Sequence, residues 1–154
     1  MCRQRVRFFI QTDIMGRLLS IDYGRKRCGI AVSDPLKICA NPLTTVRACD
    51  LIQFLKEYCA ANEVEKIIVG LPKQMDGSDS ESSRYINPFL KKLSHEMPEM
   101  PVERYDERFT SSIAHRAMID GGLHKMARRD KNLVDAIAAS IILNDYMSSL
   151  GASL

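Results

Sequence analysis

The chain has 154 residues, of which 45% are hydrophobic and 27% are charged, as in a single globular domain with a sizeable core. Its net charge of +3 at pH 7 permits an anionic partner without requiring one, so a case for nucleic acid depends on where the cations lie. Five cysteines without a C-x-x-C pair argue against a zinc site or a disulfide framework and favour the free thiols of a cytoplasmic protein.

The sequence predicts neither a membrane span nor a secretory signal at its start. No uninterrupted apolar run approaches the ~18 residues of a membrane span, so no membrane partner is expected. The first residues, MCRQRVRFFIQTDIM, lack the cleavage site of a secretory signal. Because Met15 is followed by Gly16 and then by the first strand-like run, we expect residues 1–14 to be a disordered extension and residues 15–150 to form the domain.

The first third of the chain predicts a β-hairpin, a third strand and a helix. Residues 18–23 and the run CGIAVSD are rich in β-forming residues and flank the short segment GRKR, which is typical of a hairpin. Residues 38–46 predict a third strand, and Pro42 indicates that this strand lies at an edge. From residue 50 to residue 61 the apolar residues recur with helical spacing.

The rest of the chain alternates between predicted strands and helices. KIIVGLP, residues 66–72, has the continuous apolar character of a buried parallel strand, and residues 101–106 predict another. Pro88 is expected to kink or restart a helix, and a further helix is expected after Thr110 or Ser111. The last helix is expected at about residues 132–148. This order predicts an α/β domain in which a hairpin-led mixed sheet is flanked by helices.

Asp22 is an unusual residue in its position. It lies near the carboxyl end of an apolar strand, and strand alternation places it on the same face as Leu18 and Ser20. Desolvating an ionised carboxylate costs several kcal/mol unless a cation or hydrogen bonds compensate it. Since ligands of α/β sheets bind at the carboxyl ends of parallel strands, Asp22 is a candidate site residue.

Two further acids are expected at the same edge of the sheet. Glu107 directly follows a predicted strand, and Asp135 lies in the first turns of the last helix. Asp135 shares a helical stripe with Ala138 and Ala139, whose small side chains should let the helix approach the sheet near Asp22. Converging carboxylates repel one another, and Mg²⁺ or Mn²⁺ relieves that repulsion. Two such ions about 4 Å apart would support cleavage of a phosphodiester bond.

Each of these acids also has a purely structural interpretation. Asp22 could be a hydrogen-bonded structural residue, Glu107 could form a salt bridge with Arg108, and Asp135 could simply be favoured by the helix dipole. Only their joint arrangement favours a metal site.

Four motifs occur in order along the chain: IDYGRKRCGIAVSD, VGLP followed by MDGS, YDERFTS and KNLVDAIAASIIL. Together they resemble the YqgF (RuvX) family of pre-16S ribosomal RNA nucleases, in the Holliday-junction-resolvase branch of the ribonuclease-H-like fold. The resemblance covers residues 15 to about 148. It implies a single domain with a five-stranded sheet, in which a hairpin and meander come first, and a cytoplasmic hydrolase that trims the 5′ end of pre-16S RNA.

The resemblance also assigns the site. Its catalytic and metal-binding triad falls on Asp22, Glu107 and Asp135, with Mg²⁺ or Mn²⁺ as the implied cofactor. The chain departs from the superfamily in one respect, because many of these nucleases carry an acid directly after the fourth strand. Here VGLPKQMDGS offers none before Asp76.

Basic residues flank the proposed acidic centre. We expect these cations to hold the phosphate backbone of a nucleic acid, although an ordinary solvated charge run is the alternative. The candidates are Arg25, Lys26, Arg27, Lys125, Arg128, Arg129 and Lys131. Without tryptophan and with few other aromatic residues, the chain is not expected to rely mainly on base stacking.

Three functions compete for this pattern. A nuclease that processes pre-rRNA, in association with ribosomal particles, comes first, and a Holliday-junction resolvase acting on branched DNA comes second. A non-catalytic nucleic-acid-binding factor in ribosome assembly or transcription is the third. A phosphotransferase of the actin and sugar-kinase class is set aside because it needs two domains, and a monomer or weak dimer is expected.

Overall fold

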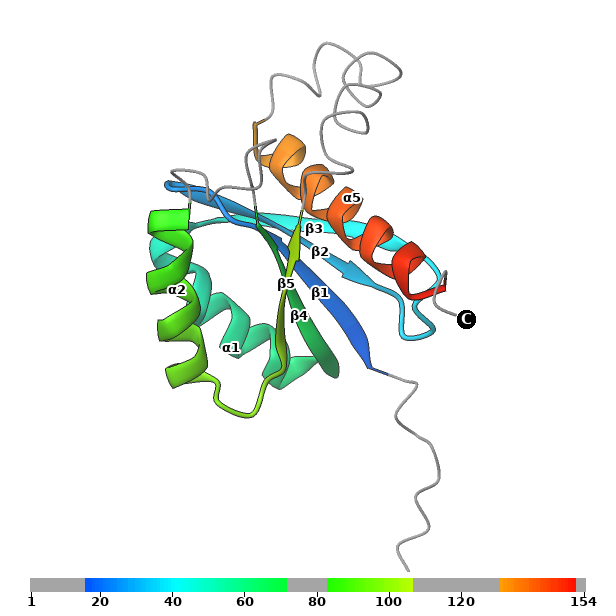
Figure 1. Ribbon diagram of the computed structural model, residues 1–154, viewed down its shortest axis with the longest axis horizontal. Helices are drawn as coiled ribbons and strands as arrows, with labels where there is room; N and C mark the ends of the chain where they lie inside the picture. Colours follow the sequence, from blue (N-terminus) through cyan, green and yellow to red (C-terminus); the bar gives the residue numbers. More distant parts are fainter. Residues whose placement is uncertain (1–15, 72–82, 107–130, 152–154) are drawn as a thin grey trace, which may run out of the picture.

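The computed structural model describes residues 16–71, 83–106 and 131–151. Five strands form one mixed sheet in the order β3-β2-β1-β4-β5 (Figure 1). The strands are β1 Arg17–Asp22, β2 Arg27–Ser33, β3 Ala40–Arg47, β4 Val64–Leu71 and β5 Val102–Asp106. The described helices are a 3₁₀ turn at Ala48–Asp50, α1 Leu51–Ala61, α2 Ser83–Glu96 and α5 Lys131–Gly151.

The strand directions confirm the predicted hairpin-led mixed sheet. Strand β2 runs antiparallel to both β1 and β3, which makes the first three strands a meander, whereas β4 runs parallel to β1 and β5 runs parallel to β4. Strand β3 lies at an edge, as Pro42 predicted, and the register between β2 and β3 shifts beside it, between Ile30 and Ala31. An edge strand tolerates proline because it needs hydrogen-bond donors on one side only.

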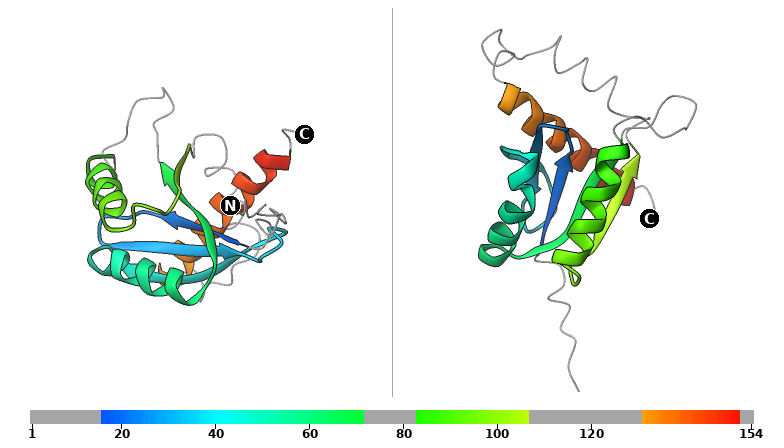
Figure 2. Two further views of the ribbon diagram at one scale, coloured as in Figure 1. Left: turned by 90° about the horizontal axis from the view of Figure 1, so that it is seen from below. Right: turned by 90° about the vertical axis from the view of Figure 1, so that its left-hand side faces the viewer.

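Helices cover the two faces of the sheet and create two separate cores (Figures 1 and 2). On one face, Leu19 and Ile21 of β1 pack among the buried side chains of α1 and α2. On the other face, Leu18 of β1 packs against α5. The hydroxyl of Ser20 donates a hydrogen bond of 2.6 Å to the Ala139 carbonyl oxygen of α5. The alternation predicted for β1 is therefore confirmed.

The helix around Pro88 begins earlier than one interpretation of the sequence allowed. Helix α2 starts at Ser83 and contains Pro88 in its interior, so the proline does not restart the helix. The apolar face of this helix is buried, with Ile86, Phe89, Leu90 and Leu93 all in the core. Burial of this face offsets the backbone hydrogen bond that proline cannot make.

Helix α5 accounts for the most apolar stretch of the described chain. The window Leu133–Leu150 is long and apolar enough to cross a membrane by length and composition alone, although it contains the charged residues Asp135 and Asp145. In the structure, Ala139, Ile142 and Leu143 of this helix are buried against the sheet. Packing in the core therefore explains the apolar character of α5.

Four sequence predictions lie outside the described residues. They concern the extension at residues 1–14, the candidate acid Glu107, the helix after Thr110 or Ser111, and the basic segment that precedes Lys131. These remain predictions.

Candidate active site

The carboxyl ends of three parallel strands meet at one edge of the sheet. Strand β1 ends at Asp22, and at the end of β5 Asp106 pairs with Leu71, the last residue of β4. The chain thus leaves β5 at the residue directly before Glu107, which itself lies outside the described residues. This edge is where parallel α/β sheets bind ligands.

Gly29 brings α5 against the strand that neighbours Asp22. Gly29 is the β2 partner of Asp22 in the antiparallel ladder, so side chains at these two positions share a face. A Cβ atom at Gly29 would lie 1.9 Å from the backbone oxygen of Asp135 and 2.8 Å from the nitrogen of Ala136. The backbone of α5 therefore touches β2 at Asp135, on the same face and at the same ladder position as Asp22.

Sequence analysis attributed this close approach to the alanines of α5 and missed the glycine. Ala139 does contribute, since its carbonyl accepts the Ser20 hydrogen bond, but the tightest contact is made at Gly29. A glycine inside a strand often marks a place where another backbone comes close. That signal was present in the run CGIAVSD.

Asp135 forms an ion pair with a residue that sequence analysis placed elsewhere. The Arg27 Nε donates to Asp135 Oδ2 at 2.5 Å, and the two side chains are 39% and 27% exposed. Arg27 was expected to hold phosphate instead. The side chain of Lys131 lies outside the described residues, as do Lys125, Arg128 and Arg129.

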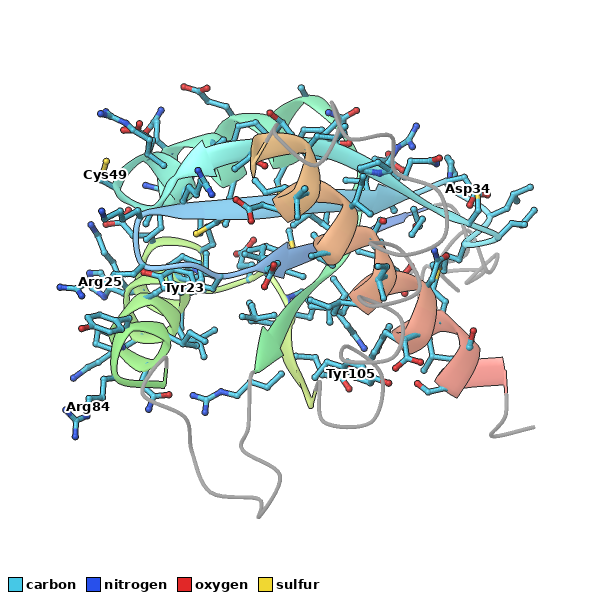
Figure 3. All side chains as sticks on the ribbon, turned by 90° about the horizontal axis from the view of Figure 1, so that it is seen from above. Tyr23, Arg25, Asp34, Cys49, Arg84 and Tyr105 are labelled. Atoms are coloured by element: carbon cyan, nitrogen blue, oxygen red, sulfur yellow. The ribbon has the colours of Figure 1, made fainter. Side chains whose placement is uncertain are left out.

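The other two cations of the β1–β2 turn, Arg25 and Lys26, are exposed. The guanidinium of Arg25 lies 5.0 Å from the centroid of the Tyr85 ring, on α2. Figure 3 shows Arg25 and Tyr23 at the end of the sheet that α2 covers. The turn after Asp22 therefore presents positive charge to solvent close to that acid.

The pKa of the Cys28 thiol is affected by both Asp22 and Asp135. Burial raises its pKa to about 11, and the negative charges of Asp22 and Asp135 contribute to the rise. A hydrogen bond to the Gly24 carbonyl acts in the opposite direction. Burial and these charges therefore disfavour the nucleophilic thiolate form of Cys28 at neutral pH.

The donor chemistry of this edge suits a hard divalent cation. Within the described residues, no group of three or more histidine, cysteine or acidic side chains is arranged to hold a metal ion. Two of the three candidate acids, Asp22 and Asp135, lie within the described residues; they supply carboxylate oxygens and are half-buried. Mg²⁺ and Mn²⁺ accept such sparse oxygen ligation and keep water in the remaining positions. The residues present fit such an ion if the Asp135 carboxylate binds it in place of the Arg27 guanidinium.

Comparison with solved structures identifies the fold. The structure is similar to Thermus thermophilus RuvC in complex with a Holliday junction substrate, with a TM-score of 0.51, 18% sequence identity and coverage of 88% of this chain and 96% of RuvC. The protein therefore has the ribonuclease-H-like fold of RuvC.

Comparison with curated sequences identifies the family. A protein of Bacteroides thetaiotaomicron named "Putative pre-16S rRNA nuclease" is 53% identical over 135 residues, covering 88% of this chain and 98% of that protein. Relatives of the same name in Christiangramia forsetii and Porphyromonas gingivalis are 53% and 50% identical, over 86% and 88% of this chain and 98% of each relative. The family model RuvX, described as Holliday junction resolvase, matches residues 16–149. The chain belongs to the RuvX family.

Proposed function

We propose that this protein is a metal-dependent nuclease that hydrolyses phosphodiester bonds during 5′-end processing of pre-16S rRNA. The observation that carries the proposal is the contact at Gly29, which holds the Asp135 backbone against the ladder partner of Asp22. Glu107, next to the end of β5, is proposed as the third acid. The name shared by relatives of about 50% identity supports the choice of substrate.

The residues of the chain divide the work between metal and substrate. Asp22, Glu107 and Asp135 would hold Mg²⁺ or Mn²⁺ through their carboxylates, and such ions would activate a water and stabilise the leaving oxygen. Arg27, which pairs with Asp135 in this structure, would then be available to the substrate phosphate. Arg25 and Lys26 bind adjacent phosphates of the nucleic-acid backbone. We propose the same role for Lys125, Arg128, Arg129 and Lys131.

A Holliday-junction resolvase is the second candidate. The description of the family model and the RuvC fold both favour it, and its metal chemistry would be the same. The two candidates differ only in substrate. As a pre-16S rRNA nuclease, the protein would act in the cytoplasm on pre-ribosomal particles, as a monomer or weak dimer.

The deciding experiment measures cleavage of end-labelled RNA spanning the 5′ end of 16S rRNA beside a labelled four-way DNA junction. Each substrate is tested with Mg²⁺, with Mn²⁺ and with chelator. The wild type is compared with Asp22→Asn and Asp135→Asn, which remove a charge and keep the size of the side chain. Asp145→Asn is the matched control, because it makes the same change on α5 ten residues from Asp135, about 15 Å along the helix.

We expect metal-dependent cleavage of the RNA by the wild type and by the Asp145→Asn protein, and none by the other two variants. Preferred cleavage of the junction would replace the first candidate with the second. If neither substrate is cut while wild type and Asp22→Asn bind RNA equally well, Asp22 is structural and the protein is a binding factor.

A further inference from the structure

A pocket opens between the start of α1 and α2, beside the end of β1. Its volume is about 210 Å³, and Tyr23, Cys49, Tyr85, Phe89 and Lys92 are among the residues that line it. Pockets for drug-sized ligands usually enclose ~300–1,000 Å³. This pocket is therefore suited to a small flat group such as a single heterocyclic ring.

Aromatic side chains form much of the pocket wall. Tyr23 and Phe89 are stacked with their ring centroids 4.8 Å apart, so Phe89 holds the Tyr23 ring in a defined orientation. Tyr85 is 41% exposed although it is a large aromatic residue. Exposed aromatic faces and arginine planes are the surfaces on which proteins stack unpaired bases.

Cations border the same pocket. Arg25 lies over the Tyr85 ring, and Lys92 lines the pocket from an exposed position on α2. A ligand that combines a flat ring with anionic groups on either side matches both the aromatic walls and the positive border. An oligonucleotide has this composition.

The pocket lies next to the proposed catalytic acid but on the other face of the sheet. Asp22 and Tyr23 are consecutive residues, and their side chains project to opposite faces as the strand ends. Asp22 shares its face with α5, whereas Tyr23 packs against the core of α1 and α2. A nucleic-acid strand with one phosphate at Asp22 can therefore pass around the end of β1 and direct a neighbouring base to Tyr23.

We propose that this pocket is a base-binding subsite that takes one unpaired nucleobase next to the scissile phosphate. The inference rests on the proposed function and adds a substrate class to it, namely nucleic acid that is single-stranded beside the cleavage position. A base held in a continuous duplex cannot enter the pocket, because it is stacked on both faces and paired with the opposite strand. Arg25 and Lys92 contact the phosphates that flank the bound base.

The first test measures binding in the presence of chelator, so that cleavage plays no part. Fluorescence anisotropy compares a labelled single-stranded oligoribonucleotide with its blunt duplex, using the wild type, Tyr85→Leu and Tyr85→Phe. We expect the leucine variant to bind the single strand roughly tenfold more weakly and the phenylalanine variant to bind it like the wild type, because the ring alone supports stacking. Lys92→Gln should weaken binding more than Lys91→Gln, which removes the same charge from the neighbouring exposed position.

A chemical footprint provides the second test. Cys49 lines the pocket and is exposed. Cys39 is also exposed, in the β2–β3 turn beside Asp34, at the other end of the sheet in Figure 3. Mass spectrometry follows the alkylation of both thiols with and without the single-stranded oligonucleotide. We expect bound RNA to slow alkylation of Cys49 and to leave Cys39 unchanged.

The two proposals fail in different ways. Equal single-strand affinity of the wild type and Tyr85→Leu, or equal protection of the two thiols, would overturn the subsite even if the wild type cleaves RNA. If the wild type bound neither form of RNA, the subsite would also be overturned. Absence of cleavage on every substrate would overturn the proposed function, whatever happens at Tyr85.

Discussion

Substituting Gly29 by alanine tests the contact on which the candidate site depends. The new Cβ would lie 1.9 Å from the Asp135 oxygen, whereas such contacts are essentially never shorter than 3.0 Å, so strand and helix must separate by more than 1 Å. Both atoms that clash with it most closely belong to the backbone of α5, which cannot rotate away as a side chain could. The φ angle of Gly29 is not in the left-handed region, so the strain is steric.

The magnitude follows from this separation. Overpacking of a core usually costs about 1–3 kcal/mol of unfolding free energy. The Ser20 hydroxyl bonds the Ala139 oxygen at 2.6 Å, one turn along α5, and a shift of over 1 Å would break that bond at a cost of ~0.5–1.5 kcal/mol. Because Asp135 moves with the helix, activity should fall by up to about 10²-fold, which is what a 1 Å misplacement of a catalytic group can cost.

The assay separates misplacement of Asp135 from loss of stability. Urea unfolding gives the stability of Gly29→Ala, and calorimetric titration with Mn²⁺ at a temperature where the variant is folded gives its metal affinity. Leu143→Ala is the control, because it empties a fully buried position of the same helix at an expected cost of about 2–5 kcal/mol without touching Asp135. The reasoning is refuted if Gly29→Ala binds Mn²⁺ and cleaves RNA like the wild type, or if Leu143→Ala loses metal affinity to the same extent.

Two further predictions follow from the ion pairs. Arg27→Gln should tighten Mn²⁺ binding by up to about fivefold, because the half-exposed pair with Asp135, worth at most ~1 kcal/mol, no longer competes; calorimetry should show no such gain for Lys26→Gln, and equal gains would refute the competition. Hydrogen bonds from Tyr146 and Lys66 hold the pKa of Glu103 below its ordinary 4.5. The contribution of Glu103 to folding stability is therefore present above pH 4.5 and is lost as the pH falls through the lowered pKa. Glu103→Gln should therefore flatten the acid side of the stability–pH profile measured by urea unfolding, by under about 1 kcal/mol because the group is exposed, and an unchanged slope would contradict this assignment.

Local patterns in the sequence determined most of the architecture. Runs of β-forming residues located the strands, and Pro42 indicated an edge because a missing backbone donor is tolerated only there. Strand alternation placed Asp22 on the face that α5 covers, since the side-chain period of a strand is independent of what packs against it. Four motifs in order indicated the family that the comparisons then established.

Only the tertiary structure decided which groups meet. The partner of Asp135 is Arg27, a residue 108 positions away in the sequence, rather than a neighbour on its own helix. The contact at Gly29 depends on how α5 lies across the sheet, and the pocket at Tyr23 is assembled from the residue after β1, the 3₁₀ turn, α1 and α2. Periodicity specifies the face of each element, whereas the packing of one element on another sets the contacts between residues distant in the chain. The sequence therefore determined where the acids lie, and the folded structure determined what surrounds them.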